Sequence, residues 1–297
     1  MSVVIRTEKL TKYYRKERGI VDLGLEIVEG EVFGYLGPNG AGKTTTIRLL
    51  LGLLHPTSGK VEVLGHDTRS VKIRRAIGYL PGELALYEDM TVKKLFTYLA
   101  NLRGLRGLGS AKEFAERLEL DMARRIGDLS SGNKQKVGLV QAFMHRPRLL
   151  ILDEPTGGLD PLMQQEFYRM IREVRREGRT VFLSSHTLSE VERIADRVGI
   201  IRDGDLVVVE GLDSLKARAP RRIELHFSGP VPSERFTALP NVEDVAVDDG
   251  VVSCRVLGSV DRLIKAAAEF EVTNIISHEA DLEELFLGYF RGDGDAA

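Results

Sequence analysis

The stretch that decides the fold is Gly37-Pro38-Asn39-Gly40-Ala41-Gly42-Lys43-Thr44. It matches the pattern G-x-x-x-x-G-K-[ST], in which glycines let successive backbone N–H groups curl around phosphates. We expect a strand at residues 32–36 before it. A helix should follow at about residues 43–53 and point its positive end at the phosphates. Lys43 would then bond the β- and γ-phosphates, and the Thr44 hydroxyl would ligate Mg²⁺. An accidental glycine-rich turn is the alternative, but the strand before the loop and the helix after it favour phosphate binding.

A second chemical feature is the apolar run at residues 149–152, which ends in Asp153 and Glu154. An unbroken apolar run of this length is typical of a buried strand. A carboxylate at the end of such a strand can hold Mg²⁺, and a second one beside it can orient an attacking water. We therefore assign the metal to Asp153 and the role of general base to Glu154. A charged turn after a core strand is the alternative.

Strand-like and helix-like segments alternate along most of the chain. Further strands are expected at residues 3–7, 24–27, 60–64, 180–184 and 198–202, and further helices at about residues 92–103, 111–118, 133–145, 162–177 and 188–195. This alternation predicts an α/β fold with a mostly parallel sheet covered by helices.

The pattern changes after a basic run at residues 216–222, which Ala219-Pro220 interrupts. Beyond it, alternation around residues 223–227 predicts a half-buried strand, and Asp248-Asp249-Gly250 predicts a hairpin turn. Helices at about residues 260–270 and 282–290, with a strand at 272–277, complete a small α+β domain. We therefore divide the chain into residues 1–218 and residues 223–297.

Composition excludes some classes of function. The 42 basic and 44 acidic residues give a formal net charge of −2, so no nucleic-acid partner is expected. Cys254 is the only cysteine and cannot form an intrachain disulfide. The sequence shows neither a signal peptide at its start nor a run of 18 apolar residues. Any membrane-spanning part is therefore expected on another chain.

The segment Leu129-Ser130-Ser131-Gly132-Asn133 looks like a variant of the signature loop Leu-Ser-Gly-Gly-Gln, and here the chain resembles the nucleotide-binding subunits of ABC transporters. Read alone, it is a serine-rich helix cap. Gly157-Gly158-Leu159-Asp160 resembles the D-loop of that family, and His186 resembles its switch histidine. Tyr14 aligns with the aromatic residue that stacks on adenine, although Tyr13 could take this place.

The resemblance implies a P-loop NTPase of the ABC ATPase type with a helical subdomain, acting with ATP and Mg²⁺. It implies a head-to-tail homodimer with two ATP molecules between the phosphate loop of one copy and the signature loop of the other. It also implies membrane-spanning permease subunits on a separate chain, and thus a peripheral position on the cytoplasmic face of the membrane. The expected catalytic residues are Lys43, Glu154 and His186, and the expected metal ligands are Thr44 and Asp153. The expected nucleotide contacts are Tyr14, Gly37, Pro38, Asn39, Gly40, Ala41, Gly42, Lys43, Thr44, Thr45, Ser130, Ser131, Gly132, Asn133 and Asp160.

Two positions depart from the family pattern. Gly82 stands where the family has a glutamine that touches Mg²⁺ and the attacking water and senses the membrane subunit. Glycine has no side chain for either task, so we hypothesise that Glu83 contacts the metal-bound water or the membrane subunit instead. A solvated loop residue is the alternative for Glu83. Asn133 replaces the signature glutamine but keeps an amide, so little loss is expected.

Several classes of function compete. A GTPase would need an Asn-Lys-x-Asp motif, which is not found. Relatives that repair DNA would carry long coiled coils, and translation-factor relatives would carry two ATPase domains. The end of the chain, Leu282-Glu283-Glu284-Leu285-Phe286-Leu287, resembles the tails of bacterial drug- and lipid-exporting ATPases. We therefore expect an exporter ATPase. An importer ATPase and a ligand-sensing regulatory ATPase are the alternatives.

Overall fold

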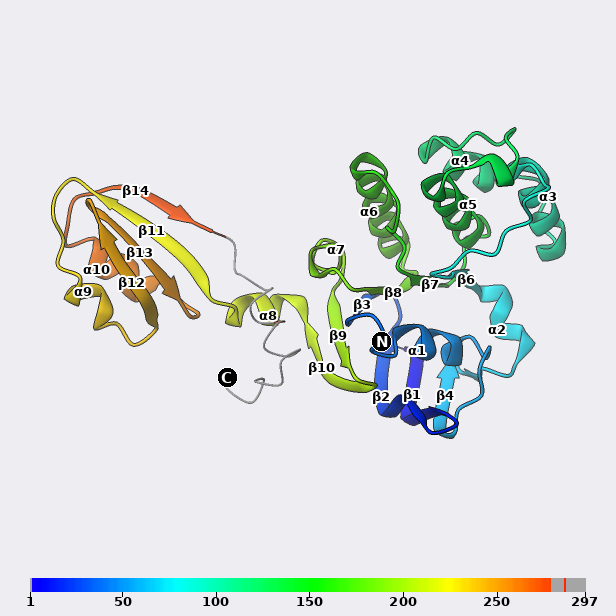
Figure 1. Cartoon of the computed structure of the whole chain (residues 1–297), viewed down its shortest axis with the longest axis horizontal. Coiled ribbons are helices and arrows are strands. Elements are labelled where there is room, and N and C mark those ends of the chain that lie inside the picture. Colours follow the sequence, from blue (N-terminus) through cyan, green and yellow to red (C-terminus); the bar gives the residue numbers. More distant parts are fainter. Residues whose placement is uncertain (1, 279–285, 287–297) are drawn as a thin grey trace. The chain divides into compact units, whose positions relative to one another are not determined.

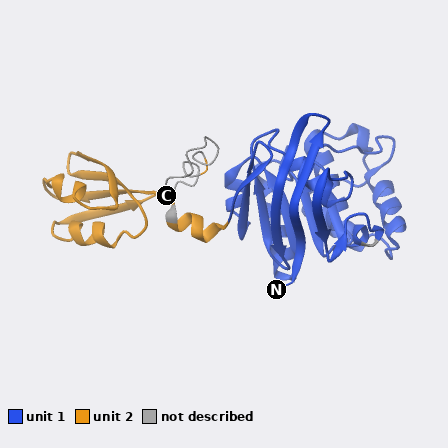
Figure 2. Ribbon diagram, turned by 90° about the horizontal axis from the view of Figure 1, so that it is seen from below, with its two compact units in different colours: residues 1–209 blue, residues 210–297 orange. Residues whose placement is uncertain are grey.

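The computed structural model describes residues 2–278 and Phe286. The chain divides into two compact units, Met1–Val209 and Glu210–Ala297, which Figure 2 shows in different colours. The domain boundary predicted from the sequence, between residues 218 and 223, stays a proposal. Each unit is described by itself.

An antiparallel sheet opens the first unit, with the strand order β2-β1-β4-β5. Its strands are β1 (Val3–Tyr14), β2 (Glu17–Val28), β4 (Ser58–Val63) and β5 (His66–Asp67). The strands predicted at residues 3–7 and 24–27 are therefore too short. Both continue into one long hairpin, in which Tyr14 pairs with Glu17. The ladder contains register shifts between Thr7 and Tyr13, and these irregularities interrupt the strict apolar alternation by which a strand is recognised in the sequence.

A six-stranded sheet carries the predicted chemistry, with the order β10-β9-β3-β8-β7-β6. Its strands are β3 (Val32–Leu36), β6 (Ile77–Leu80), β7 (Leu149–Asp153), β8 (Thr180–Ser185), β9 (Arg197–Arg202) and β10 (Asp205–Gly211). The neighbours from β9 to β6 all pair in parallel, so the α/β prediction is confirmed. The carboxyl ends of parallel strands meet at one edge of a sheet, where ligands bind in such folds. The segments after β3, β7 and β8 therefore come together.

The helices of the first unit lie around the two sheets (Figure 1). They are α1 (Lys43–Leu50), α2 (Val71–Ala76), α3 (Val92–Arg103), α4 (Gly109–Arg117), the 3₁₀ turn η1 (Ile126–Asp128), α5 (Ser131–Phe143), α6 (Pro161–Arg176) and α7 (Leu188–Glu192). Helices α3 and α4 lie on the far side of α5 (Figure 1). Helix α1 contacts β2 and β4 of one sheet and β7 of the other. Its Ile47, Leu49 and Leu50 are fully buried, each contributing roughly 1.5–3 kcal/mol. The phosphate loop that precedes α1 is thus anchored by the core.

The predicted helical subdomain consists of α3, α4 and α5. Helices α3 and α4 both pack on α5, and α5 in turn packs on β6. Helix α3 begins at Thr91, whose hydroxyl accepts the N–H of Lys94, and ends at Gly104, which has a left-handed backbone. This subdomain therefore holds α5, and with it residues 129–133, against the edge of the parallel sheet.

The second unit has the element order β11-α9-β12-β13-α10-β14 after a short helix, α8 (Leu212–Arg218). Its bounds are β11 (Arg221–Phe227), α9 (Glu234–Thr237), β12 (Val242–Asp248), β13 (Val251–Val256), α10 (Asp261–Ala267) and β14 (Val272–Ser277). The sheet order is β12-β13-β11-β14, all antiparallel. This is the split β-α-β arrangement of ferredoxin-like domains. The predicted hairpin is confirmed, because Asp249 and Gly250 both have positive φ between paired β12 and β13.

Strand β10 and helix α8 were not predicted, since no element was expected between the strand at residues 198–202 and the basic run at residues 216–222. Most residues of β10 are half-exposed, and among the described side chains of α8 only Leu212 and Leu215 are buried, so the periodicity of both segments is weak. The predicted helix at residues 282–290 lies outside the described residues except for Phe286, which is buried.

Candidate active site

The phosphate loop, residues 37–44, follows β3 and leads into α1. Gly40 and Gly42 have φ of 83° and 109°, a backbone region that side chains strongly disfavour. The buried ammonium of Lys43 donates to the carbonyl oxygens of Gly37 (2.6 Å) and Pro38 (3.2 Å). The loop thus curls so closely that its lysine folds back over it, while the predicted contact of Lys43 with phosphates stays a prediction.

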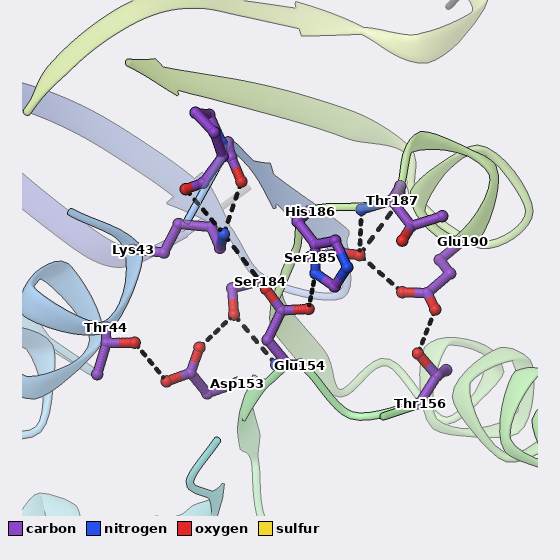
Figure 3. A network of polar contacts seen from close by, with 12 residues as sticks. Lys43, Thr44, Asp153, Glu154, Thr156, Ser184, Ser185, His186, Thr187 and Glu190 are labelled. Atoms are coloured by element: carbon purple, nitrogen blue, oxygen red, sulfur yellow. Dashed lines mark hydrogen bonds and ion pairs between the residues drawn. The ribbon is translucent and has the colours of Figure 1, made fainter. Parts of the chain in front are cut away.

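Asp153 lies at the end of β7 and is buried. One carboxylate oxygen accepts the hydroxyl of Thr44 at 2.9 Å, and the other accepts the hydroxyl of Ser184 at 2.5 Å (Figure 3). Its negative charge, after burial, contributes to the raised pKa of Tyr79 on the neighbouring strand. The two residues predicted to bind metal are therefore in direct contact through a hydrogen bond.

Glu154 is held between two cationic or proton-bearing groups. Its Oε1 lies 3.2 Å from the Lys43 ammonium, and its Oε2 lies 2.8 Å from Nδ1 of His186 (Figure 3). The Glu154 side chain is only 27% exposed, whereas that of His186 is 58% exposed. The structure thus brings together the three residues predicted to be catalytic.

The backbone of Glu154 is strained and is supported from two sides. Its φ is 50°, in the left-handed region that non-glycine residues rarely adopt. Its N–H donates to the carbonyl and hydroxyl oxygens of Ser184. From α5, the buried amide of Gln135 donates to the carbonyl oxygens of Glu154 (3.2 Å) and Pro155 (3.0 Å). Neither Gln135 nor Ser184 was predicted from the sequence, although a polar residue within a mainly apolar segment is a usable signal.

A cavity of about 330 Å³ lies beside the phosphate loop. Its lining consists of Tyr14, Arg18, Gly19, Pro38, Asn39, Gly40, Gly42, Lys43, Thr44, Thr45 and Glu154. The hydroxyl of Tyr14 lies 3.3 Å from that of Thr45. Tyr13 is exposed but does not line the cavity, so the geometry favours Tyr14 as the aromatic residue next to a nucleotide. Arg18 was not predicted, because an exposed arginine near the start of β2 gives no sequence signal.

The signature loop, residues 129–133, leads into α5. Ser130 is the N-cap of this helix, and its hydroxyl accepts the backbone N–H of Asn133 at 3.3 Å and the side-chain amide at 3.2 Å. The capping interpretation of this serine is therefore confirmed. The neighbouring Ser131 is exposed. The phosphate-binding role of the loop stays a prediction.

The signature loop packs against the predicted D-loop of the same chain. A Cβ built on Gly132 would lie 2.4 Å from the carbonyl oxygen of Gly158. Asp160, at the end of the D-loop, caps α6 by accepting the N–H of Met163 at 3.0 Å. Across the described residues, no hydrogen bond joins residues 129–133 to the phosphate loop. The structure therefore groups the predicted residues into two separate clusters.

Gly82 lies directly beside the metal candidate. A Cβ built on Gly82 would sit 3.3 Å from Oδ2 of Asp153. Glu83, the next residue, is exposed. A side chain at residue 82 would therefore meet Asp153, whereas a role for Glu83 stays a hypothesis.

Several known proteins are similar to this chain. The model of a family described as "ABC transporter" matches residues 20–157. The bacitracin transport ATP-binding protein BcrA of Bacillus licheniformis is 35% identical, over 98% of this chain and 99% of its own. The linearmycin resistance ATP-binding protein LnrL of Bacillus subtilis is 32% identical, over 96% of this chain and 97% of its own. A dimeric structure of a bacterial ABC transporter cassette has a TM-score of 0.65 and 25% identity, over 70% of this chain and 98% of that one.

Proposed function

The chain belongs to the ATP-binding subunits of ABC transporters, and from this premise we propose that it hydrolyses ATP to export an antibiotic-like compound through membrane subunits on a separate chain. The observation that carries the proposal is the contact of Glu154 with both Lys43 and His186. ATP binding and hydrolysis are the common activity of this family. The predicted P-loop fold of the ABC ATPase type is confirmed by the solved cassette structures that the chain resembles.

We assign the proton-transfer role to Glu154. Its carboxylate would accept a proton from the attacking water, while His186 fixes its orientation through the 2.8 Å contact. Lys43 would exchange its contacts with Gly37 and Pro38 for phosphate oxygens when a nucleotide enters. These exchanges leave the strained backbone of Glu154 in place, since Gln135 and Ser184 hold it.

The residues around Asp153 fit a magnesium ion. Mg²⁺ prefers oxygen ligands and is usually bound by one or two carboxylates together with phosphate and water. The Thr44 hydroxyl and the Asp153 carboxylate supply such oxygens 2.9 Å apart. Gly82 has no side chain that could occupy the space beside Asp153. When bound there, the ion would neutralise charge on the transferring phosphoryl group. No cluster of three acidic, histidine or cysteine side chains suitable for a metal occurs in the described part of the chain, as expected where the phosphates complete the ligand set.

A second copy of the chain would complete the site. In this proposal Ser130, Ser131, Gly132 and Asn133 of one copy face the phosphates bound by the other, with Asp160 beside them. The N-terminus of the 13-residue helix α5 supplies the positive end of a helix dipole at this loop. The dimeric cassette structure supports such an assembly for this family.

Similarity over the full length supports export. BcrA and LnrL match nearly the whole chain, including the second unit, and their names refer to transport of, or resistance to, antibiotics. We propose an antibiotic or lipid-like cargo and a peripheral position on the cytoplasmic face of the membrane. Within the described residues, no helix has the length and apolar character needed to span a bilayer, so the pore would come from the partner subunits.

Antibiotic susceptibility tests this proposal. Co-expression of the chain with its membrane subunit should raise the inhibitory concentration of a cyclic peptide antibiotic such as bacitracin, and Lys43→Ala should abolish the effect. Lower intracellular accumulation of labelled antibiotic, dependent on Lys43, would support export. ATP-dependent uptake of a solute into right-side-out membrane vesicles would contradict export and favour the importer alternative.

A further inference from the structure

We propose that Glu190 is a positioning residue that fixes the loop carrying His186 against the loop carrying Glu154, and thereby sets the contact between these two side chains. The inference rests on the proposed roles of Glu154 and His186. It concerns a carboxylate on α7 that does not line the nucleotide cavity.

Glu190 joins two loops through its two oxygens. Its Oε2 accepts the hydroxyl of Ser185 at 2.6 Å, and its Oε1 accepts the hydroxyl of Thr156 (Figure 3). Ser185 is fully buried and Thr156 is 3% exposed. Hydrogen bonds to an ionised acceptor in such surroundings are strong and directional. One carboxylate thus ties the end of β8 to the segment after β7.

At the end of β8, the hydrogen bonds made by Glu190 restrain the backbone around His186. Ser185 directly precedes the histidine, and its hydroxyl oxygen accepts the N–H of Thr187 at 2.9 Å. The hydroxyl proton of Ser185 can reach the carbonyl oxygen of Thr187 at 3.2 Å or Glu190 at 2.6 Å. The proton should go to Glu190, because that hydrogen bond is shorter and has a carboxylate as its acceptor. The backbone on both sides of His186 is therefore fixed through Glu190.

On the β7 side, the tie acts on Glu154. Thr156 lies two residues after Glu154, in a turn closed by the N–H of Gly157 donating to the Glu154 carbonyl oxygen at 3.3 Å. Because Glu154 has a strained backbone, its side-chain direction depends on the surrounding restraints. A restraint at Thr156 is thus transmitted to Glu154 over one turn.

The helix that bears Glu190 is itself firmly placed. Val191 and Leu188 are buried, and α7 packs on β3 and β8. The approach is so close that a Cβ on Gly34 of β3 would lie 2.2 Å from Val191. Glu190 therefore extends from a fixed base, and loss of its carboxylate should release the two loops without displacing the helix.

Steady-state kinetics of the full-length chain test the inference. Glu190→Ala should lower kcat by about 10- to 100-fold, because a displacement of about 1 Å can cost 100-fold. The affinity for ATP should change less than twofold, since Glu190 does not line the cavity. Glu190→Gln keeps one acceptor oxygen and should lose less. The control is Ser189→Ala, an exposed neighbour on α7, which should leave kcat unchanged. Equal kcat in wild type and Glu190→Ala would overturn the proposal.

A double-mutant cycle separates positioning from general stability. If Glu190 acts through His186, then Glu190→Ala should have little further effect on kcat in a His186→Ala background. Additive losses would contradict the proposal. Thr156→Val removes the bonded hydroxyl at nearly constant shape and should lower kcat, whereas Thr156→Ser should retain it. These two variants keep the test decisive if Glu190→Ala does not fold.

The ring signals of His186 provide a readout independent of hydrolysis. In protein with labelled histidine, assigned through His186→Gln, these signals should shift or broaden in Glu190→Ala and Thr156→Val but not in Ser189→Ala. Unchanged ring signals would refute the tie itself. Full hydrolysis by Glu154→Gln, with altered ring signals in Glu190→Ala, would instead refute the role of Glu154 and leave the tie standing.

Discussion

The phosphate loop and the signature loop differ in where their polar groups find partners. Around the phosphate loop, Lys43 and Thr44 contact Glu154 and Asp153, residues more than a hundred positions away in sequence. In the signature loop, Ser130 and Asn133 bond mainly to each other across the first turn of α5. One region is completed by the tertiary fold of a single chain, while the other has the local contacts of a helix cap.

In the proposed dimer, this difference indicates how the work would be divided between the two copies. A phosphate loop whose side-chain partners all lie in its own chain can bind a nucleotide before a second copy joins, whereas a capped helix end can donate its remaining N–H groups to a ligand bound by another copy. The close packing of Gly132 on Gly158 ties the signature loop to the D-loop. A partner that contacts one loop would therefore contact the other.

The largest effect is expected in the phosphate-loop region. Glu154→Gln should lower kcat by about 10²- to 10⁴-fold, because an amide cannot accept the proton of the water. ATP binding should persist, since Lys43 and the loop backbone remain. Lys43→Ala should weaken ATP binding itself. ATPase assays combined with equilibrium binding of a fluorescent ATP analogue measure both. Retained turnover in Glu154→Gln would show that another residue is the base.

A change in the signature loop should affect assembly instead. In a Glu154→Gln background with ATP, sedimentation should show a dimer, because a ligand bound between copies favours association. Ser130→Arg should convert most of it to monomer by placing bulk and charge at the partner's phosphate. Ser130→Ala is the control, since it removes only the cap, worth about 1 kcal/mol. Equal dimer fractions with and without Ser130→Arg would mean that the loop is a helix cap alone.

Two glycines allow a matched test of the contact between the loops. Gly132→Ala should lower the free energy of unfolding by about 1–3 kcal/mol, because the added methyl would lie 2.4 Å from the Gly158 carbonyl oxygen. Gly157→Ala should cost less, since its methyl would lie 3.4 Å from the Glu154 carbonyl oxygen, an ordinary van der Waals distance. Urea denaturation followed by circular dichroism compares the two. A larger loss for Gly157→Ala would contradict the packing argument.

A smaller effect is expected next to Asp153. With the membrane subunit present, Glu83→Ala should lose part of the stimulated ATPase rate if Glu83 contacts the metal-bound water or the partner. Adding Gly82→Gln should restore some of it, because a side chain at residue 82 points at Asp153. ATPase rates with and without the membrane subunit provide the measurement. Unchanged stimulated rates in Glu83→Ala would end the hypothesis.

The smallest effect is a dependence of stability on pH, caused by a histidine at the C-terminal end of α5. His145, just beyond α5, bonds the carbonyl oxygen of Ile77. Burial, aided by the charge of Arg103, lowers its pKa from 6.5 to about 4. The unfolded chain therefore binds the proton more readily, and this residue should destabilise the fold as the pH falls from about 6.5 towards 4. Thermal melting at pH 7 and pH 5 should show a larger decrease for wild type than for His145→Gln. Equal decreases would exclude His145 as the cause.

Local patterns were sufficient for much of this protein. The phosphate loop is recognisable because its glycines and lysine act within eight consecutive residues, and the strand before Asp153 is recognisable because burial on both faces demands an unbroken apolar run. The strict order of these motifs led to the family, which the full-length relatives confirm. The α/β alternation and the hairpin at Asp249-Gly250 follow from equally local rules.

The tertiary structure alone decided which side chains meet. The contacts of Gln135 with Glu154 and of Glu190 with Thr156 and Ser185 join separate elements, and no periodicity or motif records such distances. The same holds for strand β10, whose half-exposed residues join the sheet only because β9 offers its edge. Sequence by itself thus determined the chemistry that the chain carries, since each motif acts over a few residues. The tertiary structure determined which of these chemical groups contact one another, because contacts between distant segments depend on how the whole core packs.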